Sequence, residues 1–162
     1  MVSQDDKVIC LLENKLCCCR FYENYAQQTD SLFGKYIDVT FGQNGRMAAL
    51  QKYEDKIFVK TLRISSQGEF EFINEVLVEE RVGELPDHLA LHYSFSENII
   101  LLSQNSKHVF QRVFDKNLGK NIENNRYLKV KGAKMNPEIN FFVNRDEDLL
   151  VMVDSLGNVF WG

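Results

Sequence analysis

A short pattern of apolar runs and turns occurs four times along the chain, and it constrains the fold more than any other feature. In the clearest copy, a run at 36–41 is followed by a Gly-Gln-Asn-Gly turn and a second run at 47–50. A second turn at 53–55 leads into a third run at 56–59. Asn, Asp, Gly and Ser favour turns because they tolerate positive φ or hydrogen-bond their own backbone. The pattern predicts antiparallel strands throughout, and therefore an all-β fold.

The middle run of each copy is nearly continuously apolar, whereas the runs beside it alternate apolar and polar residues. Continuous apolar runs are typical of strands buried on both faces, and alternation is typical of half-buried strands. Because no linker-like stretch divides the chain, we expect a single β-repeat domain over residues 1–162. Its units are expected at about residues 1–23, 36–80, 88–131 and 138–162.

The first and last copies are shorter than the others. The first has no recognisable leading strand, and the last stops after its third strand. On this interpretation the chain begins and ends partway through a unit. We therefore expect unpaired strand edges at Lys15–Cys19 and at Val159–Trp161.

The spacing of the copies favours one all-β architecture over another. The second turns of the four copies lie at Asn14, Glu54, Asn105 and Ser155, at intervals of 40, 51 and 50 residues. A fourth strand fits after the third run, at 69–73 or 76–78 in one copy and at 127–130 in another. Four short strands per roughly 40 to 50 residues are typical of a propeller blade, whereas a β-sandwich needs no such recurrence. We expect a partial β-propeller of about three to four blades.

The end of the chain carries a family resemblance. Residues 157–162 read Gly-Asn-Val-Phe-Trp-Gly, which resembles the blade ending of the regulator-of-chromosome-condensation repeats but is one residue shorter. Residues 109–110 followed by 117–119 are similar to the continuation of that repeat. Other residues stand where that family has glycines: Glu97, Asn98 and Arg145. The Trp-Asp repeat propellers are the alternative family, with a period nearer about 40 residues. The first family includes exchange factors for small GTPases as well as interaction propellers, and no residue here matches a motif for exchange activity.

Charge and hydrophobicity exclude several functional classes. The formal net charge of −4 and the pI of about 5.4 provide no long-range attraction for nucleic acid or anionic membranes. The longest apolar runs, such as 149–153, are far shorter than the roughly 20 residues that cross a bilayer. The polar, acidic start at residues 1–6 differs from a secretory signal. We expect an intracellular protein of the cytoplasm or nucleus that has no membrane partner.

The cysteines and histidines form no recognisable metal or catalytic motif. The cysteines lie at positions 10 and 17–19, without the paired spacing of a zinc site, and we expect free thiols. His88 and His92 would share a strand face, and with His108 they are expected to be structural or surface residues. The nucleotide-binding and hydrolase motifs are also missing. We predict no metal, no cofactor and no enzyme, with an unrecognised active site as an alternative.

A basic stretch supports a second alternative, a small β-barrel that binds nucleic acid. Arg126, Tyr127, Lys129 and Lys131 interleave cations with an aromatic ring, as single-strand-binding grooves do. Strand alternation also explains the stretch, because it places the two lysines on the face opposite Leu128. Nucleic acid is therefore not the expected partner.

The favoured hypothesis is a non-catalytic protein-protein interaction module or scaffold subunit. An incomplete propeller would be completed by, or docked on, another protein chain, because open strand edges invite pairing. The candidate partner-binding residues lie on the two expected edges: Val159, Phe160, Trp161, Leu16 and Cys18.

Overall fold

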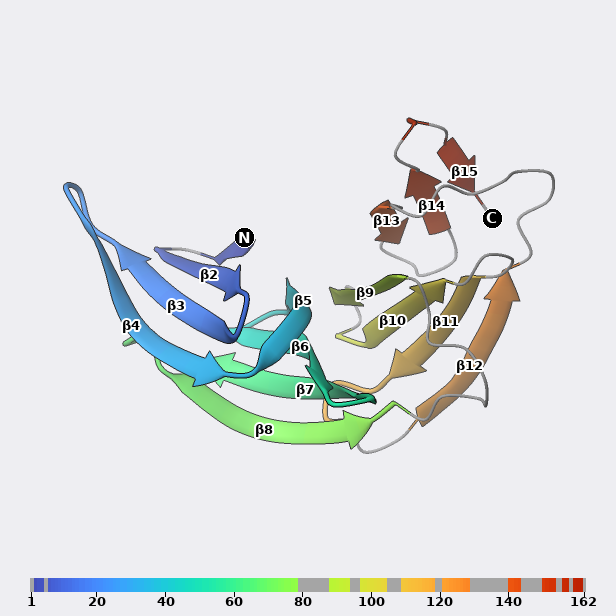
Figure 1. Cartoon of the computed structure of the whole chain (residues 1–162), viewed down its shortest axis with the longest axis horizontal. Coiled ribbons are helices and arrows are strands. Elements are labelled where there is room, and N and C mark those ends of the chain that lie inside the picture. The colour runs from blue at the N-terminus through green and yellow to red at the C-terminus, as the bar shows by residue number, and fades with distance from the viewer. Residues whose placement is uncertain are drawn as a thin grey trace. The chain divides into compact units, whose positions relative to one another are not determined.

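The structure is a computed structural model, and all the secondary-structure elements in its described part are β-strands. It describes residues 2–4, 6–78, 88–93, 97–104, 109–118, 121–128, 140–143, 150–153, 156–157 and 159–161. These residues form fifteen strands in antiparallel sheets (Figure 1), so the all-β prediction is confirmed. Within the same ranges, no helix is long and apolar enough to cross a membrane. The chain divides into two compact units, residues 1–79 and 80–162.

The first unit contains two four-stranded sheets in which strands adjacent along the chain are also adjacent in the sheet (Figure 1). The first sheet consists of β1 (Val2–Gln4), β2 (Lys7–Leu12), β3 (Lys15–Phe21) and β4 (Ala26–Phe33). The second consists of β5 (Lys35–Phe41), β6 (Arg46–Tyr53), β7 (Lys56–Ile64) and β8 (Phe70–Leu77). Short turns join the strands, and Glu54 adopts the positive φ of 53° that tight hairpin turns use.

The first sheet contains more strands than we expected from the first copy of the sequence pattern. Val2 pairs with Ile9, so the expectation that this copy lacks a leading strand is wrong. Strand β4 extends the same sheet to Phe33. Its sequence, Ala-Gln-Gln-Thr-Asp-Ser-Leu-Phe, is exposed or half-buried along its whole length. Such a strand carries no apolar run, which is why the pattern did not reveal it.

Strand β3 is consequently an interior strand. It pairs with β2 on one side and with β4 on the other. Leu16 and Cys18 are both 0% exposed. The prediction of an open edge at Lys15–Cys19 is therefore wrong, because β4 covers the edge that the sequence seemed to leave free.

The fourth strand of the second sheet is longer than either predicted segment. The candidates at 69–73 and 76–78 fall on one strand, β8, except for their outermost residues, 69 and 78, and β8 pairs with β7 along its length. The register shifts between Thr61 and Leu62, where Ile73 is the extra residue of a β-bulge. The bulge breaks the apolar alternation, so one strand looked like two.

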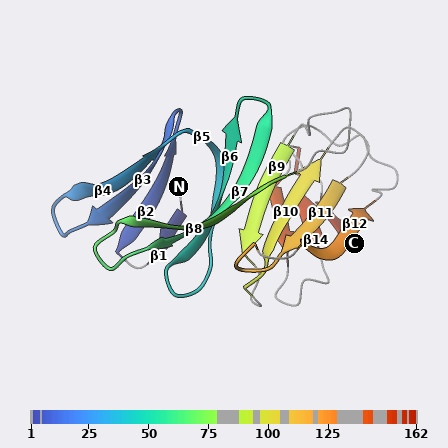
Figure 2. The same ribbon diagram turned by 90° about the horizontal axis from the view of Figure 1, so that it is seen from below.

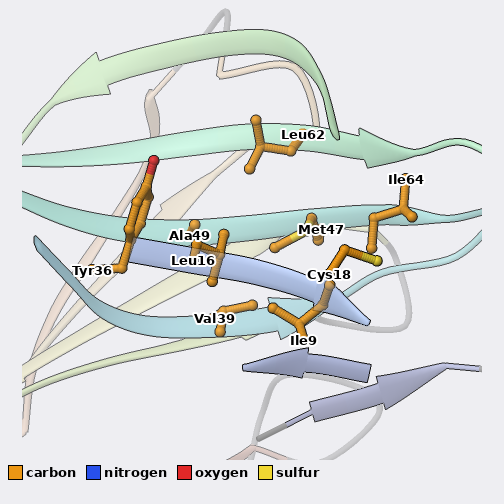
Figure 3. Close-up of a cluster of buried hydrophobic side chains, with 9 residues drawn as sticks. All are labelled: Ile9, Leu16, Cys18, Tyr36, Val39, Met47, Ala49, Leu62 and Ile64. Carbon is orange, nitrogen blue, oxygen red and sulfur yellow. The ribbon is translucent and has the colours of Figure 1, made fainter. Parts of the chain in front are cut away.

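The hydrophobic core of the first unit lies between its two sheets (Figure 3). From the first sheet it takes Ile9, Leu16 and Cys18. From the second sheet it takes Tyr36, Val39, Met47, Ala49, Leu62 and Ile64. Fully burying one large aliphatic side chain stabilises the fold by about 1.5–3 kcal/mol. The four consecutive residues 47–50 of β6 are all 0% exposed, which confirms the prediction of a strand buried on both faces.

The second unit repeats the arrangement in its own first sheet. This sheet has the order β12-β11-β10-β9 (Figure 2) and consists of β9 (His88–Tyr93), β10 (Ile99–Gln104), β11 (Val109–Phe114) and β12 (Asn121–Leu128). Ile99, Ile100 and Leu101 are at most 1% exposed, as expected for a middle strand. The fourth strand was expected at 127–130, but it begins earlier, at Asn121. The prediction missed this start because the strand begins with the largely polar sequence Asn-Ile-Glu-Asn-Asn.

The remaining sheet has three strands in the described part of the chain. Its order is β13-β14-β15, with β13 (Asn140–Val143), β14 (Leu150–Val153) and β15 (Val159–Trp161). Strand β14 lies in the middle and pairs with both neighbours. Strand β15 is therefore at one edge of this sheet.

Candidate functional site

A hollow of about 220 Å³ opens on the first unit, where β4 meets the inner face of the second sheet. We call it the β4–β8 groove. Pairing of Met47 with Leu62 and of Leu62 with Phe72 continues the buried face of β6 outward to β8. The lining residues of the groove are Leu32, Phe33, Tyr36, Gln51, Lys60, Leu62, Phe70 and Phe72.

Two exposed aromatic side chains form the rim of the groove. Phe33, the last residue of β4, is 80% exposed, and Phe72 of β8 is 59% exposed. Leaving such large apolar side chains in water forgoes the free energy that their burial would release. Exposed apolar side chains that gather at one concave place are typical of binding surfaces.

Two polar side chains lie deeper in the groove. Tyr36 is 8% exposed and Gln51 is 9% exposed. Burial and, to a lesser extent, the charge of Glu75 raise the pKa of the Tyr36 phenol, so the hydroxyl stays protonated at neutral pH. In Figure 3 this hydroxyl points away from the other core side chains. A neutral phenol and a carboxamide can each donate and accept a hydrogen bond.

A glycine makes room for the Gln51 side chain. Gly34 connects β4 to β5 with a φ of 137°, which side-chain-bearing residues rarely adopt. A Cβ at this position would overlap the amide nitrogen of Gln51. The Gly34 N–H donates to the Asn14 carbonyl oxygen at 2.8 Å and fixes this connection. The glycine at this connection thus leaves room for one of the residues that line the groove.

One ion pair lies at the outer side of the groove. The Lys60 ammonium is 3.0 Å from a Glu75 carboxylate oxygen and 5.9 Å from the centroid of the Phe72 ring. Ammonium groups at this distance are attracted to the face of an aromatic ring. The pair is partly exposed and adds little stability by itself, but it holds Lys60 beside the Phe72 ring.

Two hydrogen bonds join β4 to the segment at the start of β8. The Thr29 hydroxyl donates to the Gly68 carbonyl oxygen at 2.8 Å, and the Phe70 N–H donates to the Asp30 carboxylate at 2.8 Å. They join the two sides of the groove, since Leu32 and Phe33 follow on β4 and Phe72 follows on β8. The groove is therefore built on fixed strands, a requirement for a selective site.

The residues predicted to bind a partner fall into two groups. Leu16 and Cys18 are buried in the core and cannot contact a partner across an open edge. Val159 lies on the edge strand β15 and is 52% exposed. Phe160 and Trp161 lie on the same strand, and their side chains are outside the described part of the structure.

The residues of the nucleic-acid alternative are only partly described. Arg126 and Tyr127 lie on β12, where the backbone alone is described, and Lys129 and Lys131 fall outside the described residues. His88 and His92 lie on β9, while His108 also falls outside. The basic stretch thus remains a prediction.

The four cysteines are free thiols on β2 and β3. Cys10 pairs with Cys17 across the two strands. Burial raises the pKa of the Cys18 thiol, and burial with neighbouring thiols raises that of Cys19. In the described ranges, no three His, Cys, Asp or Glu side chains are arranged to hold a metal ion.

The groove was missed at the level of sequence because it depends on contacts between two sheets. Phe33 is the last residue of a largely polar strand, and Phe70 and Phe72 belong to a segment predicted only as a possible fourth strand. The one local signal was the Phe-Glu-Phe alternation, which places two rings on the same strand face.

Fold and groove together define an all-β protein of repeated antiparallel meanders. No protein-family model and no curated protein matches the chain. Among solved structures, the chain is similar to the crystal structure of a protein from Lactobacillus plantarum, with 13% sequence identity and a TM-score of 0.59. The likeness covers 93% of this chain and 50% of the other, so the chain spans about half the length of that structure. At this identity the likeness concerns the fold alone.

Proposed function

We propose that this chain is a non-catalytic protein-protein interaction module built from blades of a β-propeller. The observation that carries the proposal is the recurrence of one four-stranded meander, in β1–β4, in β5–β8 and in β9–β12. Four antiparallel strands in sequential order are the unit of a propeller blade. The regulator-of-chromosome-condensation and Trp-Asp repeats remain the two families to which such blades are compared.

The likeness to a solved structure twice as long supports the idea of an incomplete ring. A propeller closes only when its last blade contacts its first. The remaining blades would come from another protein chain or from further blades. In either case a binding partner covers strand edges and apolar faces that would otherwise be exposed.

The β4–β8 groove is the second support for an interaction function. Phe33 and Phe72 are the most exposed phenylalanines of the first unit, and both lie on its rim. Aromatic side chains dominate the binding energy of protein interfaces. A partner protein is thus a better match to this surface than a reacting substrate.

The proposal is tested by the assembly state of the purified 162-residue chain. Light scattering measures the mass, and amide hydrogen exchange measures the protection of each strand, with β6 and β10 as buried references. We expect association above the 18.9 kDa of one chain, or poor protection of one outer sheet in a monomer. A monodisperse monomer in which every strand is protected would contradict the proposal, because nothing would be left for a partner to complete.

A further inference from the structure

We infer that the β4–β8 groove binds one aromatic side chain, presented by an extended and basic segment of a partner protein. This inference rests on the proposed interaction function and specifies the ligand at one site. Four features support it: the size of the groove, the chemistry of its walls, its position beside a strand edge and the charge of that edge.

The size of the groove corresponds to a single side chain. A cavity of ~150 Å³ lined by apolar residues holds one benzene molecule, whereas sites for larger organic ligands span about 300–1,000 Å³. The groove, at about 220 Å³, falls between these values. It has room for one aromatic ring with its attached methylene group, and too little room for a nucleotide or another large cofactor.

The chemistry of the walls favours an aromatic ring. Phe33, Phe70 and Phe72 line the groove with aromatic rings from two strands, β4 and β8. Aromatic pairs in offset or edge-to-face contact gain about 0.5–1.5 kcal/mol beyond the burial of area. The Tyr36 hydroxyl and the Gln51 amide lie deeper in the groove, where the bound ring would come close to them.

The position of the groove favours an extended segment. Strand β8 is the last strand of its sheet in the described part of the chain, so its outer edge is open to another strand. It has eight residues and contains neither proline nor lysine, two residues that commonly protect such edges. An extended peptide that pairs with β8 would direct alternate side chains into the groove.

The charge of β8 favours a basic segment. This strand carries Glu71 and Glu75 and no cation; Glu75 is paired with Lys60, so Glu71 is the exposed carboxylate that would meet a cation of the partner. The nearest cations, Lys60 and Arg63, lie one strand further in on β7, opposite these carboxylates. Glu71 lies on the face opposite the groove, because it is one residue from Phe70 and Phe72. A peptide with its aromatic ring in the groove would therefore place its two flanking side chains near Glu71.

The test uses three blocked tripeptides, Arg-Phe-Arg, Arg-Ala-Arg and Glu-Phe-Glu, titrated into the ¹⁵N-labelled chain. We expect saturable shifts with Arg-Phe-Arg at the Gln51 side-chain amide and the Phe70 and Phe72 backbone amides. Arg-Ala-Arg and Glu-Phe-Glu should each bind at least about tenfold more weakly, because one lacks the ring and the other carries the wrong charge.

Variants at the rim locate the binding site. Phe72→Ala and Phe33→Ala should each weaken binding of Arg-Phe-Arg about tenfold. Because both rings are exposed, neither substitution should disturb the fold. Tyr53→Ala is the matched control, since Tyr53 is an aromatic residue 62% exposed outside the groove. Equal binding of all three peptides, or unchanged binding by both rim variants, would overturn the inference. Tight binding of phenol alone would overturn the peptide segment and indicate a small-molecule site.

The assembly measurement separates this inference from the proposed function. If the wild type assembles and Arg-Phe-Arg fails to bind to it, the groove assignment is wrong and the propeller proposal stands. If the wild type is a fully protected monomer that binds Arg-Phe-Arg, the propeller proposal is wrong and the groove assignment stands.

Discussion

The carboxylate of Asp30 accepts a hydrogen bond from the backbone N–H of Phe70 at 2.8 Å, across 40 positions of sequence. The N–H belongs to the first residue of β8, and the carboxylate belongs to the middle of β4. A side chain of the first sheet thus substitutes for a neighbouring strand at the start of the open β8 edge. This bond defines where β8 can still accept another strand.

Replacing Asp30 should destabilise the first unit. Asp30→Ala leaves the Phe70 N–H without its charged acceptor, and hydrogen bonds to charged groups contribute about 1.5–3 kcal/mol. Asp30→Asn keeps an acceptor oxygen and should cost about 1 kcal/mol or less. Urea unfolding, followed by circular dichroism, measures both values. Equal stability of the alanine variant and the wild type would show that this hydrogen bond does not hold the two sheets together.

The neighbouring contact between Thr29 and Gly68 predicts a coupled pair of substitutions. Gly68 has a φ of 87°, and a Cβ there would lie 2.5 Å from the Thr29 hydroxyl oxygen. Gly68→Ala should therefore cost more than the roughly 1–3 kcal/mol of backbone strain alone. Thr29→Ala removes the overlapping hydroxyl and should recover part of the added loss in the double variant. Strict additivity in a double-mutant cycle would argue that the two residues do not touch.

The interior position of β3 gives a third prediction. Leu16 is 0% exposed within the core, so Leu16→Ala should destabilise the first unit by about 2–5 kcal/mol. Leu12→Ala is the matched control at a position 46% exposed, and it should cost less than about 1 kcal/mol. Guanidinium unfolding compares the two. Similar losses in both variants would show that Leu16 is not buried in the core.

The middle strands could be predicted from sequence because burial on both faces leaves a continuous apolar run, as at 47–50 and 99–102. The outer strand β4 could not be predicted, because Gln27 and Gln28 face solvent and leave no apolar period. Missing β4 then produced the false edge at β3. Weak apolar patterning thus led to an error in topology, although the fold class was right.

The groove is harder to predict from the sequence than the strands are. It exists because Phe33 of one sheet and Phe72 of the other reach the same hollow, and that meeting depends on the packing between sheets. Strand alternation indicates which residues share a face but not which face of another sheet they contact. The hydrogen bond between Asp30 and Phe70 also depends on how the two sheets pack. A carboxylate and a backbone N–H leave no periodic signal in the sequence.

The Tyr36 phenol predicts how stability depends on alkaline pH. Burial and then the Glu75 charge raise its pKa in the folded chain above the ordinary value of about 10. The unfolded chain therefore loses this proton first, and the stabilising contribution, fully present below pH 10, is lost as pH rises through and beyond that value. Tyr36→Phe removes the proton, so its free energy of unfolding should fall less than that of the wild type between pH 9 and 11.

The difference between the two proteins isolates this residue, because the Cys18 and Cys19 thiols, whose pKa values are also raised, titrate in both. Urea unfolding at intervals across the alkaline range measures the two curves. Absorbance of tyrosinate during the same titration reports whether one phenol ionises late in the wild type. If the curves run parallel, the Tyr36 hydroxyl is freely solvated, and the groove is more open than its lining indicates.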